Sequence, residues 1–317
     1  MRRRDFIGLA ASAALASAAR AFQHTAAPPS QAGPAPLSPK PGELGLLISP
    51  FRAPEETIRR VHDLGFTTCF LSLDGYIGRF TPASADEIKG LLIKYRVRAT
   101  TVEVVGPQPL VWDFLQGPST IGLVPRKTRA ARIAALKDVS DFAARLGVPQ
   151  VQTHCGFIPE DPADSLYAET VAAIREVAMH CERHGQDFLM ETGQETPTTM
   201  SRMLHDAARP NLGVGLDTAN LILYGKANPV DAVTILGPHI KSVHAKDGRW
   251  PTNPDQLGQE VLIGKGLVDF RAVFTRLLQA GYTGAITIER ETSGPQQIED
   301  VRAEKLYLEN VLRDLQA

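Results

Sequence analysis

Cysteine is scarce in this sequence, which limits the kinds of covalent and metal chemistry that thiols can support. Among 317 residues there are three cysteines, Cys69, Cys155 and Cys181. The odd number argues against a framework in which every cysteine is paired. No two of them have the CxxC spacing of a thiolate metal site. Cys69 and Cys155 fall in apolar runs, so we expect buried free thiols.

The sequence also lacks an excess of charge of either sign. It has 34 Lys and Arg against 35 Asp and Glu, for a formal net charge of -1. Nucleic acids and anionic membranes attract proteins with a clustered positive surface, and we expect neither as a partner. Hydrophobic residues make up 43% and charged residues 22%, as in ordinary globular proteins.

No apolar run near the start is long enough to cross a bilayer, which requires ~20 residues. Residues 2–4 are all arginine, and an apolar run rich in Ala, Leu and Ser continues to Ala19. Ala19-Arg20-Ala21 provides a small-x-small cleavage site, so residues 1–21 are predicted to be a signal peptide. The alternative is a short membrane anchor, but no stop-transfer pattern follows.

Arg3-Arg4-Asp5-Phe6-Ile7 matches the twin-arginine type of export signal, which predicts a periplasmic protein free of the membrane after cleavage. Residues 22–42 are rich in Pro, Ala, Ser and Gly and are predicted to form a flexible tether. Residues 43–317 then form the predicted catalytic domain.

Within that domain, short apolar runs alternate with longer amphipathic stretches. The runs are continuously apolar, as in parallel strands covered on both faces. Glycines stand between a helical stretch and the next run, where a helix C-cap belongs: Gly65, Gly147, Gly185 and Gly281. The predicted strands are 44–49, 67–73, 99–105, 148–154, 187–191, 212–217, 240–244 and 285–289.

About eight strand-helix units in one chain predict a closed (β/α)8 TIM barrel. The competing fold is an open, doubly wound sheet. That fold usually has a glycine fingerprint after its first strand, whereas Ser49-Pro50-Phe51-Arg52 contains no glycine. The barrel is therefore the predicted fold.

The ends of these strands are rich in metal-ligand side chains, and TIM-barrel active sites lie at that end of the barrel. Several carboxylates at one mouth require a compensating charge, because unpaired buried carboxylates are costly. One divalent cation held by Glu191, Asp217, His244 and Glu289 supplies that charge. The ligand set suits Mn, Co or Mg and can also accept Zn. The strand ends, in order, are Asp74, Glu103, His154, Glu191, Asp217, His244 and Glu289.

Each ligand has a structural alternative when taken alone. Glu191 and Glu289 are compatible with carboxylates paired to helix N-termini, and His244 with a hydrogen-bonded core histidine. Asp217 is compatible with a cap of the following helix. The metal site is the stronger hypothesis because all four residues occur at one end of one predicted barrel.

At these residues the chain resembles the sugar isomerase and epimerase family that has the xylose-isomerase-like barrel. A further similar run, 264–270, looks like the family's Gly-x-Gly-x-x-Asp-Phe turn. The resemblance covers the chain from about Leu44 onward. The four matching segments are Met190-Glu191-Thr192-Gly193, Gly215-Leu216-Asp217-Thr218-Ala219-Asn220, Val243-His244-Ala245-Lys246-Asp247 and Ile288-Glu289.

The resemblance implies an enzyme that acts on a small carbohydrate or polyol next to a carbonyl. Glu191 and Glu289 would transfer the proton at the adjacent carbon through an enediolate, and Asp217 and His244 would mainly bind metal. Asn220 and Lys265 depart from residues that are common in the family. Expected substrate-binding residues are His154, Asn220, Lys246, Asp247, Arg249 and Trp112.

Alternatives remain for several of these residues and for the reaction. Lys246 and Asp247 are also compatible with a loop ion pair, His154 with a core histidine, and loop 106–125 with a surface excursion. A lyase acting on a keto-sugar, keto-glycoside or keto-inositol, or a non-catalytic sugar-binding barrel, would use the same fold. An apurinic-site endonuclease is rejected, because it needs more histidines and a basic face. A homo-oligomer stays open.

Overall fold

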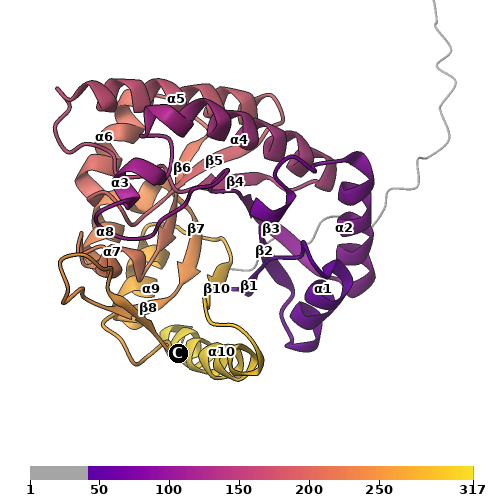
Figure 1. Ribbon diagram of the computed structural model, residues 1–317. Coiled ribbons are helices and arrows are strands. Elements are labelled where there is room, and N and C mark those ends of the chain that lie inside the picture. The colour runs from indigo at the N-terminus through magenta and orange to yellow at the C-terminus, as the bar shows by residue number, and fades with distance from the viewer. Residues whose placement is uncertain (1–41, 317) are drawn as a thin grey trace, which may run out of the picture. The chain divides into compact units, whose positions relative to one another are not determined.

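The computed structural model describes residues 42–316, and both predicted N-terminal segments, apart from Gly42, lie outside that range. Eight parallel strands close into a barrel in the order β1-β10-β7-β6-β5-β4-β3-β2 (Figure 1). The predicted TIM barrel is therefore confirmed. The strands are β1 (Leu44–Ile48), β2 (Thr68–Ser72), β3 (Arg98–Glu103), β4 (Gln150–Thr153), β5 (Asp187–Glu191), β6 (Leu212–Asp217), β7 (Ile240–Ala245) and β10 (Ile286–Ile288).

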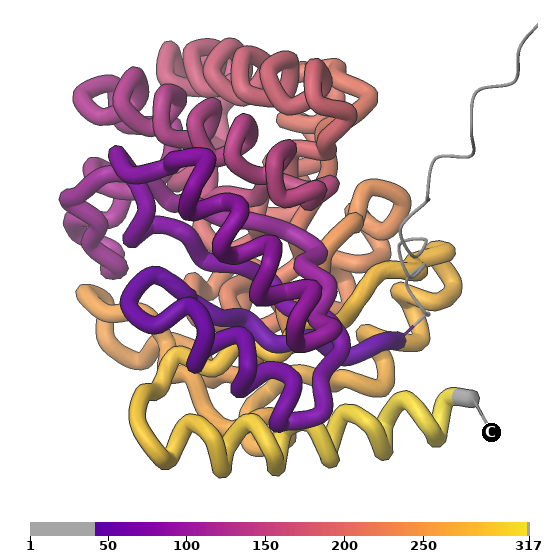
Figure 2. The backbone as a smooth tube through the Cα atoms, turned by 90° about the vertical axis from the view of Figure 1, so that its right-hand side faces the viewer, coloured from indigo at the N-terminus to yellow at the C-terminus, as the bar shows by residue number. Residues whose placement is uncertain are grey.

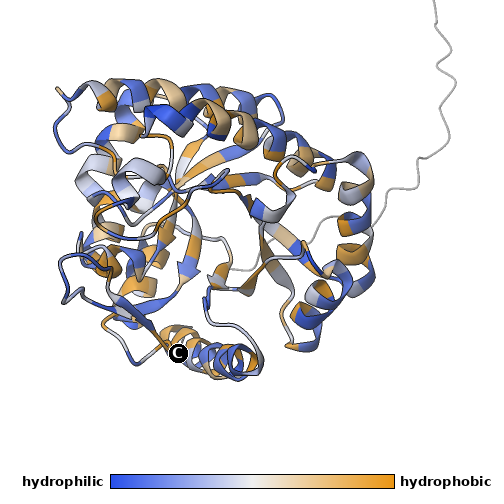
Figure 3. Cartoon of the chain, in the orientation of Figure 1, coloured by the Kyte–Doolittle hydropathy of each residue, from blue (hydrophilic) through white to orange (hydrophobic). Residues whose placement is uncertain are grey.

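Helices surround the strands, and hydrophobic and hydrophilic residues alternate along them (Figure 3). Their apolar faces cover the outside of the barrel, which explains why the strands are continuously apolar. The helices are α1 (Pro54–Asp63), α2 (Pro82–Tyr95), α3 (Gly117–Thr120), α4 (Arg126–Leu146), α5 (Ser165–Glu182), α6 (Pro197–Ala207), α7 (Asn220–Leu223), α8 (Pro229–Leu236), α9 (Phe270–Gln279) and α10 (Pro295–Gln316).

Local sequence sets where these helices begin and end. Thr81 and Ser84 form a capping box at the start of α2, and Asp164 caps α5 through a bond from the Leu166 amide. The four predicted C-cap glycines all have positive φ, from 67° to 83°, as a left-handed cap requires.

The last strand closes the barrel by pairing with the first, at Leu44 opposite Ile286. The α10 helix then runs along one side of the molecule (Figure 2). Its Leu308 is fully buried in the core. Cys69 and Cys155 are buried free thiols, as expected from the sequence, and Cys181 is also buried and unpaired. Within residues 42–316, none of the helices has the length and hydropathy that a membrane span requires.

Outside the barrel, a two-stranded antiparallel hairpin lies beyond β7. It consists of β8 (Asp247–Arg249) and β9 (Gln259–Val261). The long loop between β3 and α4 is held by Arg132, which is fully buried. Its guanidinium donates to the carbonyls of Gly122 and Pro109. The loop therefore has a defined conformation over the mouth of the barrel.

Candidate metal centre and substrate pocket

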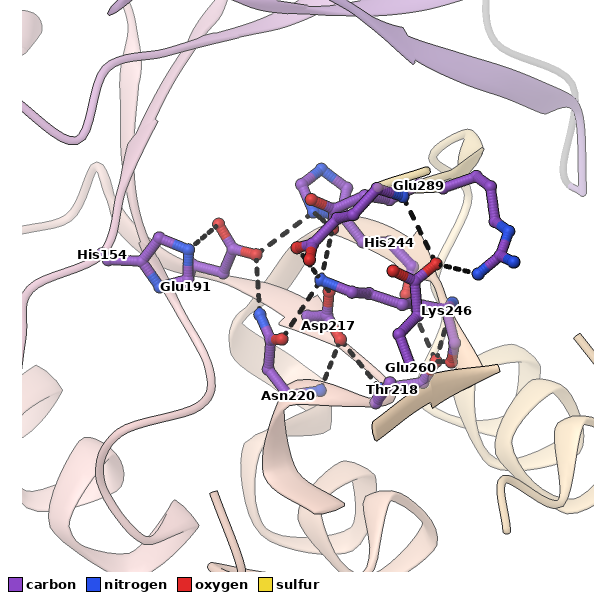
Figure 4. A network of polar contacts seen from close by, with 12 residues as sticks. His154, Glu191, Asp217, Thr218, Asn220, His244, Lys246, Glu260 and Glu289 are labelled. Atoms are coloured by element: carbon purple, nitrogen blue, oxygen red, sulfur yellow. Dashed lines mark hydrogen bonds and ion pairs between the residues drawn. The ribbon is translucent and has the colours of Figure 1, made fainter. Parts of the chain in front are cut away.

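Four neighbouring strands bring the predicted ligands to one place. Glu191 ends β5, Asp217 ends β6, His244 is in β7, and Glu289 directly follows β10. One potential ligand atom from each lies within 4.8 Å of the others. The first three residues are buried, and the Glu289 side chain is 15% exposed. The tertiary structure thus assembles a four-residue ligand set (Figure 4).

His244 stands between the two glutamates. Its Nδ1 atom lies 3.2 Å from Glu191 Oε1 and 3.2 Å from Glu289 Oε2. The Phe70 ring packs edge-on against the imidazole at a centroid distance of 4.4 Å. That packing fixes the ring so that one nitrogen faces both carboxylates.

Asp217 both caps the following turn and presents a free oxygen to the site. Its Oδ1 accepts from the amides of Ala219 and Asn220, at 2.8 and 2.7 Å. Its Oδ2 is buried and has no hydrogen-bond partner among residues 42–316. The helix-cap interpretation and the ligand interpretation therefore apply to different oxygens of the same carboxylate.

The unpaired oxygens test whether these residues suit a divalent cation. Glu289 Oε2, like Asp217 Oδ2, is buried without a hydrogen bond from the described chain. Lys246 Nζ lies 3.6 Å from the former and 3.8 Å from the latter, beyond hydrogen-bond length. Because unpaired buried carboxylate oxygens are costly, three carboxylates and an imidazole at this spacing fit a metal ion.

Burial and neighbouring charge act in opposite directions on the carboxyl groups. Burial would raise the pKa of Glu191, but the charges on His154 and His244 outweigh it and lower that pKa to about 2. Burial would also raise the pKa of Glu289, but the charges on Lys246 and His244 outweigh it and hold that pKa well below its usual value. Both proposed proton-transfer groups are therefore ionised and able to accept a proton.

A second group of side chains lies beside this set on the β3–β4 side. His154 Nε2 is 3.3 Å from Glu191 Oε2, and Gln152 Nε2 donates to the same oxygen at 3.0 Å. Glu103 is buried close to them. Burial and the negative Glu191 raise the pKa of Glu103 well above its usual value. These residues position Glu191 from the side opposite His244.

A cavity of about 300 Å³ opens over the ligand set. His154, Asn220 and Trp112, all predicted substrate contacts, line it. The Trp112 ring lies 5.0 Å from the His154 ring in an edge-on arrangement. The complete lining is Leu47, Ser72, Glu103, Val105, Trp112, His154, Asn220, Leu223, Tyr224, Leu257, Glu289 and Glu291.

Lys246 lies beneath this cavity rather than in a surface loop pair. Its side chain is 2% exposed, and Nζ donates to Glu291 Oε1 at 2.5 Å and to Asn220 Oδ1 at 3.3 Å (Figure 4). The nearby carboxylates of Glu289 and Asp217 raise its pKa despite burial. The ammonium is thus a fixed positive charge next to the predicted ligands.

Asp247 and Arg249 do not reach the cavity. The Asp247 carboxylate is buried and accepts backbone amides of Gly264, Gly266 and Val268 at 2.9 to 3.1 Å. Arg249 lies two residues along β8 and is exposed, with its guanidinium 3.4 Å from the Lys265 carbonyl. Alternation along the strand therefore directs both side chains to the turn after β9.

Several contributors to the site were absent from the residues expected on sequence grounds. Glu103 ends a predicted strand, but no motif assigned it a role. Gln152 precedes His154 by two residues, so strand alternation places both on one face. Glu291 follows Glu289 by two residues. The signal that could have identified Gln152 from the sequence is its polar side chain within an otherwise apolar strand.

Comparison with known proteins identifies the family. The model of the xylose isomerase-like TIM barrel family matches residues 58–311. The chain belongs to this family. A xylose isomerase domain protein from Planctomyces limnophilus has a similar structure, with a TM-score of 0.80 and 31% identity over 86% of this chain and 98% of that chain.

The relatives of this barrel include an epimerase and a dehydratase. A D-psicose 3-epimerase structure shares the fold, with a TM-score of 0.65 and 18% identity over 85% of this chain and 99% of its own. The inosose dehydratase of Lacticaseibacillus casei is 27% identical over 129 residues, which are 37% of this chain and 42% of that protein. The chain spans about half the length of the curated relatives it matches first, 47% and 58%.

Proposed function

We propose that this chain is a metal-dependent sugar isomerase or epimerase in which Glu191 and Glu289 transfer the proton. The observation that carries the proposal is the placement of their carboxylates, each 3.2 Å from the same His244 nitrogen. Both are ionised because His244 and a second neighbouring cation lower the pKa of each against burial. The family supports a small carbohydrate or polyol as the substrate.

A divalent metal on Glu191, Asp217, His244 and Glu289 would polarise the substrate carbonyl and make the adjacent C–H more acidic. One glutamate then removes that proton, and the C–H electron pair forms the enediolate. The other glutamate, which would first take up a proton from solvent, would return that proton to the opposite face of the same carbon or to the neighbouring carbon, and the first glutamate would release its own proton to solvent. The atoms balance, and no external oxidant or reductant is required.

The residues around the two glutamates orient the substrate and control charge. Lys246 Nζ, 3.6 Å from Glu289 Oε2, favours the ionised form of that base. His154 and Asn220 present polar atoms to the cavity, and Trp112 forms one apolar wall. A lining that combines an aromatic ring with polar groups is suited to a sugar, which has an apolar face and a hydroxyl-rich edge.

Glu191→Gln and Glu289→Gln test the two-base mechanism. Each amide keeps an oxygen ligand but removes a proton-transfer group, and such groups are typically worth 10²–10⁴-fold in rate. A panel of ketoses is first assayed with the parent protein. For a ketose that the parent converts, we expect turnover by each variant to fall by about 10²-fold or more, while metal content falls much less. Activity is measured by NMR, and metal by elemental analysis. Glu87→Gln, on the exposed face of α2, is the matched control.

The two variants also report which glutamate serves which face of the substrate. In an epimerase, a variant with one intact base should still exchange the α-proton with solvent deuterium but should fail to complete inversion. Normal turnover by both amide variants with metal bound would show that the two-carboxylate mechanism is wrong. A metal-loaded protein that exchanges no proton on any ketose would instead favour a sugar-binding barrel.

A lyase is the second candidate, since the inosose dehydratase relative is 27% identical. After the same proton abstraction, the electron pair would expel a β-hydroxyl, which leaves as water after protonation. The proton removed from carbon, held on the glutamate, would protonate the departing hydroxyl, so the step balances. Release of a dehydrated product from a keto-inositol, without inversion of any ketose, would select this reaction over epimerisation.

A further inference from the structure

The cavity over the ligand set is rich in carboxylates and poor in cations. Of its lining residues in the described part of the chain, none is lysine or arginine, whereas Glu103, Glu289 and Glu291 are acidic. Glu291 stands at the mouth, with a side chain that is 59% exposed. A ligand entering this cavity therefore passes a negative group before it reaches the bottom.

The nearest cation beneath the cavity is already surrounded by negative charge. Lys246 Nζ has carboxylate oxygens of Glu291, Glu289 and Asp217 at 2.5, 3.6 and 3.8 Å. With Glu191 of the same ligand set, four carboxylates therefore lie near this single ammonium. The Lys246 ammonium is thus already paired with carboxylates, and among the described residues that line the cavity no lysine or arginine is left to attract an anion.

The backbone amides at the position that commonly binds phosphate in such barrels are already bonded to a carboxylate of the chain. Phosphate sites often use the loops after the seventh and eighth strands, where successive backbone amides converge on the anion. Here the amides of Gly264, Gly266 and Val268 converge on the Asp247 carboxylate instead. A Cβ atom on Gly266 would lie 2.0 Å from Asp247 Oδ1, which shows how closely the turn wraps this carboxylate.

Other positive groups nearby are committed to structural partners. Arg290 follows the Glu289 ligand, but its guanidinium bonds to Glu260 at 2.6 Å and Asp300 at 2.8 Å. The N-terminus of α9 is capped by Asp269, whose Oδ1 accepts from the Ala272 amide at 2.9 Å. Neither group is available to neutralise a substrate phosphate.

We propose that this site takes uncharged polyhydroxy carbonyl compounds of monosaccharide size and rejects phosphorylated sugars, with Glu291 as a determinant of that choice. The proposal rests on the proposed function in treating the cavity as the substrate site. A volume of about 300 Å³ lies at the lower end for ligand pockets, which suits a single sugar. Trp112 and Tyr224 provide the aromatic walls for its apolar face.

Matched pairs of neutral and phosphorylated ketoses test this selectivity by binding. The full chain, loaded with Mn²⁺, is titrated calorimetrically with D-fructose and D-fructose 6-phosphate, D-tagatose and D-tagatose 6-phosphate, and D-xylulose and D-xylulose 5-phosphate. We expect at least one neutral ketose to bind at least about tenfold more tightly than its phosphate. Glu291→Lys should reduce that ratio several-fold, and Glu291→Gln should reduce it less. Glu87→Lys, with the same charge change on α2, should leave it unchanged.

The outcomes separate this proposal from the proposed function. A phosphorylated ketose that binds as tightly as its neutral partner overturns the proposal, as does failure of every neutral ketose to bind. A ratio that Glu291→Lys leaves unchanged removes Glu291 from the explanation and contradicts the proposal as stated. Selective binding of a neutral ketose without solvent-deuterium exchange would support the selectivity while contradicting the isomerase or epimerase.

Discussion

Glu195 is a buried carboxylic acid that the proposed chemistry does not use. It is 1% exposed, and both carboxylate oxygens lack a hydrogen-bond partner within residues 42–316. Burial raises its pKa to about 8, against a usual value of 4.5. At neutral pH the folded protein therefore holds Glu195 largely protonated, while the unfolded chain holds it ionised.

This raised pKa predicts a specific pH dependence of stability. Below pH 4.5 both states are protonated, and the contribution to stability is fully present; it is lost as the pH rises toward 8. Glu195→Gln removes the titration, so its stability relative to the parent should increase across that window. Between pH 4 and pH 8 we expect the variant to gain about 4–5 kcal/mol relative to the parent, because the pKa shift from 4.5 to about 8 is worth ~1.4 kcal/mol per unit.

Urea unfolding at pH 4, 6 and 8 measures this effect, with Glu87→Gln as an exposed control. An equal change in stability at all three pH values would show that the amide alters packing rather than removing a buried ionisation.

The ligand set makes a second prediction at the residue scale. Asp217→Ala and His244→Ala each remove one of four converging donors, and loss of a ligand should remove most bound divalent metal. Elemental analysis after dialysis against Mn²⁺ measures the loss, and circular dichroism checks that the barrel persists. Full occupancy in both variants would place the metal elsewhere.

Among the elements, the turn after β9 depends on one carboxylate. Asp247 accepts amides from Gly264, Gly266 and Val268 as well as that of Gly248. Asp247→Ala would leave these donors without their acceptor, and an unsatisfied buried donor costs about 1–3 kcal/mol. We expect a loss of at least about 2 kcal/mol in unfolding free energy.

Hydrogen exchange should localise that effect. In Asp247→Ala, residues 262–268 should exchange faster while the barrel strands keep their protection. Asp255→Ala, at an exposed position in the hairpin loop, is the control. Unchanged hydrogen exchange in residues 262–268 would contradict a structural role of Asp247 in this turn. The role predicted from the sequence, in which Asp247 contacts substrate, would then be tested by ligand binding to the variant.

For the whole molecule, the N-terminal segment predicts a destination. If residues 1–21 are a twin-arginine signal, Arg3→Lys together with Arg4→Lys should retain the folded protein in the cytoplasm. Cell fractionation of a bacterial host with immunoblotting measures this, and Arg2→Lys serves as the matched control. Continued periplasmic accumulation of the double variant would contradict the twin-arginine route.

The fold was predictable from the sequence because it follows local rules that repeat along the chain. Parallel strands covered on both faces are continuously apolar, and each predicted strand agrees closely with an observed one. Helix ends depend on glycines with positive φ, such as Gly147 at 83°. The convergence of Glu191, Asp217, His244 and Glu289 followed from the barrel, because all strands end at the same mouth.

The roles of the other polar residues depended on which way each side chain points after its strand ends. Lys246 and Asp247 are adjacent in sequence, yet their side chains have different surroundings. Lys246 lies beneath the cavity, whereas the Asp247 carboxylate accepts hydrogen bonds from backbone amides of the turn after β9. Gln152 and Glu291 act through residues far away in the chain, Glu191 and Lys246. Sequence alone determined the barrel and the convergence of its four candidate metal ligands. The surroundings of each charge were decided by the tertiary structure, because burial and long-range contacts set which groups are paired.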